Sequence, residues 1–273
     1  MDEQIKLIVK NALKEDIPKI DVSSEFLFSN EQSFGKFIAK EKGVISGITV
    51  CKETFEQVDQ DTVFKILKKD GEKVNKGDVI ATVEGLTKSI LMAERVGLNF
   101  LQRMSGIATM TSKFVEQISG FKCKILDTRK TTPLLRILEK QAVVDGGGTN
   151  HRMSLSDMVM LKDNHLKAAN SIIEAVKKVR NAIGKSLEIE VEVETIEQFK
   201  EALKSDCNII MLDNMSNQLM KECVDLNQGK KRLEASGNMS LRRVKAVAET
   251  GVDYISVGSL THSYKSLDIS LKF

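Results

Sequence analysis

The stretch from Lys124 to His165 decides the fold of this chain, and it reads KILDTRKTTPLLRILEKQAVVDGGGTNHRMSLSDMVMLKDNH. It contains two short apolar runs, and basic residues follow each run and also the glycine loop between them. Arginine and lysine are rarely buried unless they are paired, so the packing of a core does not call for cations at the ends of its strands. The three basic clusters therefore predict a pocket for a ligand that carries several carboxylates or phosphates.

The composition predicts a cytoplasmic globular protein and argues against two classes of partner. The net charge of +3 is the remainder of 41 basic and 38 acidic residues, so the chain as a whole does not favour nucleic acid. No apolar segment approaches the roughly 18 residues of a membrane span, and the first ten residues do not resemble a signal peptide. The four cysteines are far apart without metal-ligand spacing, which is typical of reduced thiols in the cytoplasm.

The first 120 residues show helical and strand-like patterns. Apolar residues recur at helical spacing from Ile5 to Leu13, and β-type runs follow that are punctuated by Asp70-Gly71. These patterns predict an N-terminal domain with a first helix, strands at 44–50, 63–67 and 79–83, a helix at 87–104 that Gly106 ends, and a second helix at 108–118.

Repeated strand and helix units follow Gly120. Candidate strands begin near Lys122, Met158, Leu187, Asn208, Arg232 and Asp253, with a short extra strand at 142–144. Helix starts are predicted at Thr132-Pro133, at Ser171 and at Thr195, the last two with the spacing of a capping box. Such units form a parallel sheet, either open or closed into a barrel. Because polar residues follow almost every strand, and a barrel gathers these strand ends at one mouth, the pattern favours a barrel.

Acidic residues and loops at this mouth predict a metal and phosphate site. Alternation in 190–194 puts three glutamates on one face, where one or more of them, with Asp213, can hold Mg²⁺. The alternative is a salt-bridged barrel interior. Ser236-Gly237-Asn238 and Gly258-Ser259 follow the last two strands, where barrels bind phosphate. The residues alone predict an enzyme that joins or splits two anionic small molecules, one of them phosphorylated, with Mg²⁺.

Seven motifs, in order along nearly the whole chain, resemble one known family. They are Glu94-Arg95, the run from Asn99 to Thr109, the run from Asp127 to Pro133, Asn150-His151-Arg152, Lys162-Asp163-Asn164-His165, Leu212-Asp213-Asn214 and Leu260-Thr261-His262-Ser263. With this set the sequence resembles quinolinate phosphoribosyltransferase, also called nicotinate-nucleotide pyrophosphorylase (carboxylating).

The resemblance implies a two-domain α/β fold and a reaction. The fold is an N-terminal α/β sandwich domain at 1–106, joined by a C-terminal strand at 266–273, and an incomplete (open) α/β barrel of the type II phosphoribosyltransferase kind at 107–265. The reaction transfers phosphoribose from phosphoribosyl pyrophosphate (PRPP) to quinolinate with loss of CO₂. Its product, nicotinate mononucleotide, belongs to de novo NAD biosynthesis.

The resemblance also implies residue roles and a homodimer, which can assemble further. Quinolinate would be bound by Arg129, His151, Arg152 and Lys162, with Arg103 from the neighbouring subunit. The catalytic residues would be Lys130, Glu192 and Asp213, of which the two acids hold Mg²⁺. The phosphates of PRPP would bind at Lys130, Thr131, Ser236, Gly237, Asn238, Gly258 and Ser259.

Three residues depart from the family pattern, and two other functions stay open. Leu134 and Asn238 stand where the family often has glycine, and Ser259 stands where alanine is usual, which puts the affinity for phosphate in question. One alternative is a protein of the same fold with a different anionic acceptor, as found among molybdenum-transport gene products. The other is a catalytically silent binding protein. The intact sets of cationic and catalytic residues argue against both.

Overall fold

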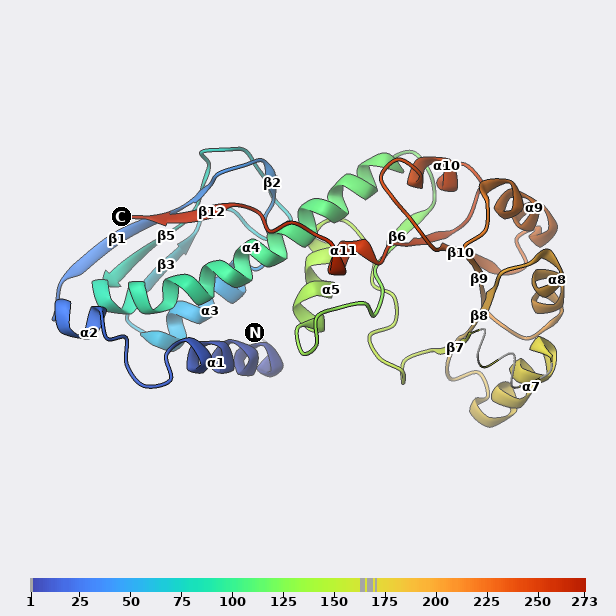
Figure 1. The fold of residues 1–273 in the computed structure, drawn as a ribbon, viewed down its shortest axis with the longest axis horizontal. Coiled ribbons are helices and arrows are strands. Elements are labelled where there is room, and N and C mark those ends of the chain that lie inside the picture. Colours follow the sequence, from blue (N-terminus) through green and yellow to red (C-terminus); the bar gives the residue numbers. More distant parts are fainter. Residues whose placement is uncertain (1, 163–164, 166–168, 170) are drawn as a thin grey trace. The chain divides into compact units, whose positions relative to one another are not determined.

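The computed structural model describes residues 2–162, 165, 169 and 171–273. This part of the chain divides into two compact units (Figure 1). The N-terminal unit consists of Met1–Ser112, Thr131–Gly147 and Leu260–Phe273, and the parallel-sheet unit consists of Lys113–Lys130 and Gly148–Ser259. Among the described residues, no helix has the length and apolar character that crossing a membrane requires.

The N-terminal unit is built on an antiparallel four-stranded sheet with the order β12-β1-β5-β3. Its strands are β1 (Gln32–Ala39), β3 (Val63–Ile66), β5 (Val79–Leu86) and β12 (Ile269–Lys272), and a separate pair joins β2 (Gly43–Val44) and β4 (Lys73–Val74). The helices along these segments are α1 (Glu3–Asp16), α2 (Ser24–Leu27), α3 (Ile48–Val58), α4 (Thr87–Gln117) and α5 (Arg136–Asp145). Because β12 pairs with β1, the end of the chain completes the sheet of the first domain.

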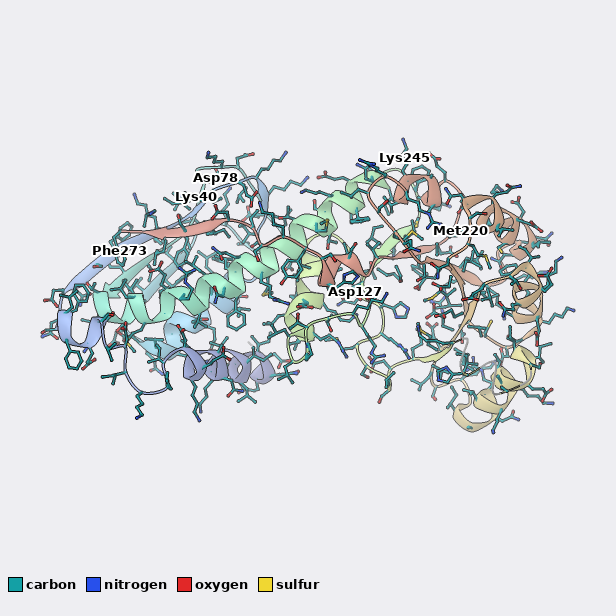
Figure 2. The ribbon with its side chains drawn as sticks, in the orientation of Figure 1. Lys40, Asp78, Asp127, Met220, Lys245 and Phe273 are labelled. Carbon is teal, nitrogen blue, oxygen red and sulfur yellow. The ribbon has the colours of Figure 1, made fainter. Side chains whose placement is uncertain are left out.

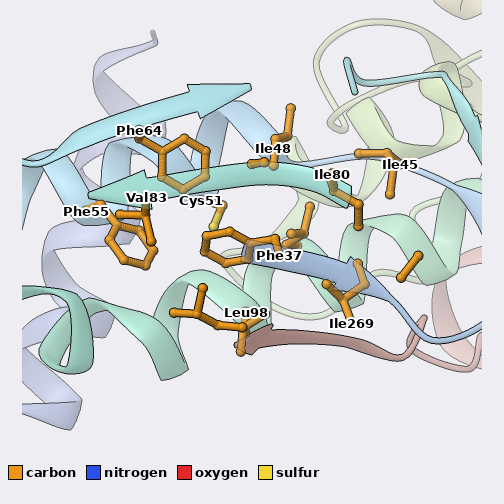
Figure 3. Packing of buried hydrophobic residues seen from close by; sticks show 14 of the residues in the cluster. Phe37, Ile45, Ile48, Cys51, Phe55, Phe64, Ile80, Val83, Leu98 and Ile269 are labelled. Atoms are coloured by element: carbon orange, nitrogen blue, oxygen red, sulfur yellow. The ribbon is translucent and has the colours of Figure 1, made fainter. Parts of the chain in front are cut away.

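A cluster of buried apolar side chains holds the N-terminal unit together (Figure 3). The rings of Phe37 in β1, Phe55 in α3 and Phe64 in β3 meet with centroids 5.3 to 5.7 Å apart. Leu98 of α4 and Ile269 of β12 belong to the same cluster. Full burial of such a side chain contributes about 1.5–3 kcal/mol. The cluster therefore determines which face of the sheet packs against the helices.

Helix α4 is continuous, so the prediction of two helices separated at Gly106 is wrong. A Cβ atom at Gly106 would lie 2.3 Å from the carbonyl oxygen of Lys265 and 2.8 Å from Cα of Ser266. The glycine therefore permits a close approach of two backbones, which is a common use of this residue, and does not end the helix.

Three smaller predictions are also wrong. Residues 142–144, predicted as a strand, lie inside α5, where Ala142 and Val143 are buried. Helix α5 begins at Arg136, so Thr132-Pro133 precedes the helix by a turn and does not cap it. The run at 44–50 contains the end of β2 and the start of α3. An apolar run as short as 142–144 does not by itself distinguish a strand from a buried segment of a helix.

The parallel-sheet unit contains six parallel strands in the order β6-β11-β10-β9-β8-β7. They are β6 (Lys124–Leu126), β7 (Val159–Leu161), β8 (Ile189–Val193), β9 (Ile209–Asp213), β10 (Arg232–Ser236) and β11 (Tyr254–Ser256). Helices α7 (Ile172–Ile183), α8 (Ile196–Lys204), α9 (Asn217–Asn227) and α10 (Val244–Ala248) lie outside the sheet, and α11 (Ser259–His262) follows β11 (Figure 1). The edges of the sheet are β6 and β7, which confirms the predicted open α/β barrel.

The caps predicted for two of these helices are confirmed. The side chain of Ser171 accepts a hydrogen bond from the backbone N–H of Glu174 at the start of α7. Thr195 and Gln198 form a capping box at the start of α8. Each cap satisfies N–H groups that have no partner inside the helix, so these helix starts are specified locally.

Candidate active site

One face of the parallel sheet carries a row of polar side chains toward the C-terminal ends of the strands. Glu192 of β8 pairs with Met211 of β9, and Met211 pairs with Glu234 of β10. Side chains of paired residues point to the same face of a sheet, as do residues two apart along a strand. The polar residues that share this face are therefore Glu190, Glu192, Asp213, Glu234 and Ser236.

Glu192 and Asp213 supply carboxylates at the ends of two neighbouring strands. Oε2 of Glu192 accepts a hydrogen bond from Nζ of Lys162 at 3.1 Å. Oδ2 of Asp213 accepts one from Nδ2 of Asn214 at 2.6 Å. Carboxylates with water and substrate phosphates are the ligands that Mg²⁺ prefers, so the pair suits this ion. The motif residues Asp163-Asn164 lie outside the described residues.

The loops after β9 and β10 are bound to each other. A Cβ atom at Gly237 would lie 2.2 Å from Oδ1 of Asn214, and Nδ2 of Asn238 donates to this oxygen at 3.2 Å. Arg243 joins both loops, because its guanidinium donates to the carbonyl oxygens of Gly237 at 2.9 Å and Met215 at 2.7 Å. Asn238 has a φ of 51°, in the left-handed region that asparagine tolerates better than most non-glycine residues. Asparagine at 238, where the family often has glycine, is therefore compatible with the turn.

Two guanidinium groups lie near one another in this unit. Burial and the nearby charge of Arg129 lower the pKa of Arg152. The Arg152 guanidinium is held by the carbonyl oxygen of Met158, which accepts from Nη1 at 3.1 Å. Arginine pairs with carboxylates through two parallel hydrogen bonds. Two such groups together, with Lys162, suit a ligand with more than one carboxylate.

A buried polar network surrounds the ring of His151. Nε2 lies 3.1 Å from Oε2 of Glu190 and 3.3 Å from Oε2 of Glu234, and both carboxyl groups are buried. The hydroxyl of Ser256 donates to the other oxygen of Glu234. The backbone N–H of His151 donates to Oδ1 of Asp127 at 2.9 Å, and Figure 2 labels this aspartate after β6. Groups from β8 and β10 therefore meet at one imidazole, while Asp127 after β6 holds its backbone and Ser256 of β11 holds Glu234.

Hydrogen bonds determine where the proton lies on this ring. The backbone N–H of Arg152 donates to Nδ1 of His151 at 2.7 Å, so Nδ1 presents a lone pair and Nε2 carries the proton. Burial lowers the pKa of His151, but hydrogen bonds with Glu190 and Glu234 raise it to about 10. Burial and the charge of Glu234 in turn raise the pKa of Glu190 to about 7. The raised pKa values belong to the cluster as a whole, in which the ring and the two carboxyl groups share protons, and it is the hydrogen bond from Arg152 that places the lone pair on Nδ1.

The same cluster is also a possible set of metal ligands. Among the described residues, His151, Glu190 and Glu234 are the three whose ligating atoms lie within 4.8 Å of one another. Glu234 and Ser256 were not predicted from the sequence, and Glu190 was predicted only as one of three barrel carboxylates. A signal was present, because Glu234 stands between Leu233 and Ala235 in a strand, and a buried acid there needs a partner.

The remaining predicted residues lie on the N-terminal unit or at its borders. Nε of Arg103 donates to Oε1 of Glu139 at 3.1 Å, and its Nη2 donates to the hydroxyl of Thr132. The hydroxyl of Thr131 accepts from Nε of Arg136 at 2.9 Å.

The borders of the parallel-sheet unit carry three more of them. The unit's segment 113–130 ends at Lys130, whose backbone N–H donates to the hydroxyl of Thr128 at 3.1 Å. Gly258 and Ser259 follow β11, and Ser259 opens α11. The parallel-sheet unit therefore holds most of the predicted site residues, whereas Arg103 and Thr131 belong to the other unit.

Comparisons with known proteins agree with this arrangement. The model of the quinolinate phosphoribosyl transferase N-terminal domain matches residues 21–105, and the C-terminal domain model matches 107–272. The chain is 44% identical to a probable nicotinate-nucleotide pyrophosphorylase (carboxylating) of Bacillus subtilis, over 98% of this chain and 93% of that one. The solved structure of NadC from Streptococcus pyogenes superposes with a TM-score of 0.96 at 42% identity, covering 99% of this chain and 96% of that one. The solved structure of the nicotinate-nucleotide pyrophosphorylase from Francisella tularensis superposes with a TM-score of 0.95 at 37% identity, covering 99% of this chain and 96% of that one. The chain therefore belongs to the quinolinate phosphoribosyltransferase family.

Proposed function

We propose that this chain transfers phosphoribose from PRPP to the ring nitrogen of quinolinate and releases pyrophosphate and CO₂, with nicotinate mononucleotide as the product. The observation that carries the proposal is the presence of two sets of groups on one unit. The cations Arg129, Arg152 and Lys162 suit a dicarboxylate, and the carboxylates Glu192 and Asp213 suit a metal-bound pyrophosphate.

Quinolinate binding rests on charge-assisted hydrogen bonds. The planar guanidinium groups of Arg129 and Arg152 can each grip a carboxylate, and Lys162 adds a point charge. Arg103 lies on the N-terminal unit, where Glu139 holds it. In the proposed homodimer, Arg103 of the neighbouring subunit completes the quinolinate site.

PRPP binding uses the carboxylates and the loops. Glu192 and Asp213 would hold Mg²⁺, which neutralises charge on the departing pyrophosphate. The backbone of the loops at 236–238 and 258–259 would bind phosphate, together with Lys130 and Thr131. Arg243 supports the first of these loops through the carbonyl oxygen of Gly237.

The proposed chemistry has two steps. The lone pair of the quinolinate nitrogen forms a bond to C1 of the ribose, while the bond from C1 to pyrophosphate breaks and its electron pair leaves with pyrophosphate. Positive charge that develops on the ribose is stabilised by the carboxylates of this site. The ring nitrogen then carries a positive charge. The neighbouring carboxylate leaves as CO₂, its electron pair stays on the ring carbon beside that nitrogen, and the carbon takes up a proton.

The decisive experiment offers two acceptors in parallel. Purified protein is incubated with PRPP, Mg²⁺ and either quinolinate or nicotinate, and both nicotinate mononucleotide and CO₂ are measured. Equal amounts of the two products from quinolinate, with none from nicotinate, are expected. An Asp213→Asn variant should lose most of this turnover while it remains folded. A folded wild-type protein that forms neither product would overturn the proposal.

We also propose that the protein works in the cytoplasm. The four cysteines are buried free thiols, which suits a reducing compartment.

A further inference from the structure

The network around His151 has no part in the reaction steps above. We propose that Glu190 and Glu234 are positioning residues for the quinolinate site: they fix the ring of His151, which fixes the backbone of Arg152 and so places its guanidinium for the substrate carboxylate. The inference rests on the proposed function, because it concerns the same substrate and the same arginine.

The burial of these carboxyl groups is the first reason for the inference. Glu190 and Glu234 are both fully buried. Among the described residues, neither oxygen of Glu190 nor Oε2 of Glu234 has a hydrogen-bond donor, so these oxygens meet His151 only as ion-pair contacts. Burying polar groups without partners costs stability, and well-packed apolar residues in such places are often more stable. The presence of Glu190 and Glu234 is therefore better explained by the orientation that they impose on the ring of His151 than by a contribution to stability.

The geometry of the ring is the second reason. Carboxyl groups from β8 and β10 hold Nε2, and the backbone N–H of Arg152 occupies Nδ1. A rotation of the ring would break both sets of contacts together. The ring therefore links the two carboxyl groups to the backbone of Arg152.

The position of Arg152 completes the chain of contacts. Its backbone is tied to the ring at 2.7 Å, and its guanidinium is tied to the carbonyl oxygen of Met158 at 3.1 Å. The backbone N–H of His151 is tied to Asp127 after β6. Both ends of the arginine are therefore held, and a displaced ring releases one of them.

A bound cation is the competing use of the same three side chains. The ion-pair contacts of 3.1 and 3.3 Å between Nε2 and the two carboxyl oxygens already bring the ring and the carboxyl groups together without an ion. Metal analysis of the purified protein distinguishes the two uses.

The test uses charge-neutral variants of nearly the same shape. Glu190→Gln and Glu234→Gln should each raise KM for quinolinate about tenfold, because a small misplacement of a binding group is costly. KM for PRPP and the midpoint of urea unfolding should change little. Ser256→Ala, which removes the donor to Glu234, should give a smaller effect in the same direction and serves if the glutamine variants fail to fold. Glu188→Gln is the matched control, since this exposed glutamate at the start of the same strand pairs with Arg232.

A double-variant cycle tests whether the effect passes through Arg152. In an Arg152→Lys background, Glu234→Gln should change the affinity for quinolinate, measured by calorimetry, less than about twofold. Full additivity of the two changes would overturn the inference. Equal increases of KM for both substrates, or an unchanged KM for quinolinate in a folded Glu234→Gln protein, would also overturn it. A wild-type protein that contains one equivalent of a divalent metal, when the Glu234→Gln variant contains none, would do the same. Wild-type turnover tests the proposed function separately, because the inference depends only on ratios of variant to wild type.

Discussion

The guanidinium of Arg103 is held within its own chain by the carboxylate of Glu139, with Nε 3.1 Å from Oε1. The Glu139 side chain is fully buried, whereas that of Arg103 is 25% exposed. The other carboxylate oxygen accepts the backbone N–H of Thr132 at 3.1 Å, and the ring of Tyr264 lies 5.1 Å from the guanidinium carbon. One face of the arginine is thus fixed, and its exposed part remains available to a ligand.

Glu139→Gln should weaken both the fold and quinolinate binding. The amide keeps the shape but loses the charge that holds Arg103, so a loss of about 2 kcal/mol in the free energy of unfolding is expected. Urea unfolding measures this loss, and initial rates should show a higher KM for quinolinate. Glu84→Gln, on an exposed strand position of the same unit, is the control. Stability equal to that of the control would show that the ion pair contributes nothing.

Subunits with complementary defects should restore activity when mixed. Arg103→Ala removes the residue proposed to reach the neighbouring site, and Lys162→Ala removes one from its own site. After equal amounts exchange subunits, half of the dimers are mixed and each has one intact site, so about a quarter of wild-type activity is expected. The rate is measured before and after exchange. A rate that stays at the sum of the two variants would contradict a shared site.

Leu134→Gly should stabilise the protein. Leu134 is 86% exposed and has a φ of 67°, a conformation that costs a leucine roughly 1–2 kcal/mol. Glycine adopts it without strain but loses more chain entropy on folding, so a net gain of about 1 kcal/mol is expected. Thermal and urea unfolding measure the gain. Leu155→Gly is the control, because Leu155 is exposed without a positive φ and should lose stability on the same change.

Gly106→Ala should destabilise the N-terminal unit strongly. The new methyl group would lie 2.3 Å from the carbonyl oxygen of Lys265, so one of the two backbones must move. A loss of about 3 kcal/mol in the free energy of unfolding is expected. Gly97→Ala in the same helix meets the side chains of Phe55 and Cys51 at 3.0 to 3.1 Å, and these can adjust. Equal losses in the two variants would show that the contact with Lys265 is not special.

Asp70 should make stability fall as the pH rises. Burial, followed by the charge of Asp145, raises the pKa of Asp70 above its usual 3.8. Above pH 3.8 the unfolded chain releases this proton while the folded chain keeps it, so the free energy of unfolding declines until the pH passes the raised pKa. The Asp70→Asn variant has no titrating group at this position, and its amide oxygen can still accept the hydrogen bond from the backbone N–H of Ile48. The stability of this variant should therefore vary less with pH between 3.8 and the raised pKa. Urea unfolding from pH 3.8 upward checks this, and an unchanged slope would contradict it.

Local signals in the sequence were sufficient for several parts of the fold. The caps at Ser171 and Thr195 were readable because a capping box involves residues only three apart. The parallel strands were readable because apolar runs recur with helix-length spacing. Gly106 was misread because the backbone that it approaches, at Lys265, is far away along the chain.

The sequence by itself determined the family, the order of strands and helices in the parallel-sheet unit, and the cations and acids at its strand ends, because these depend on local pattern and motif. Only the tertiary structure decided what each glutamate of 190–194 does. Ion pairs with residues outside the strands put Glu190 against His151 and Glu192 against Lys162, and Glu194 is exposed. Alternation along a strand gives all three the same face, and only the neighbouring strands and loops supply the partner that distinguishes one carboxylate from the next.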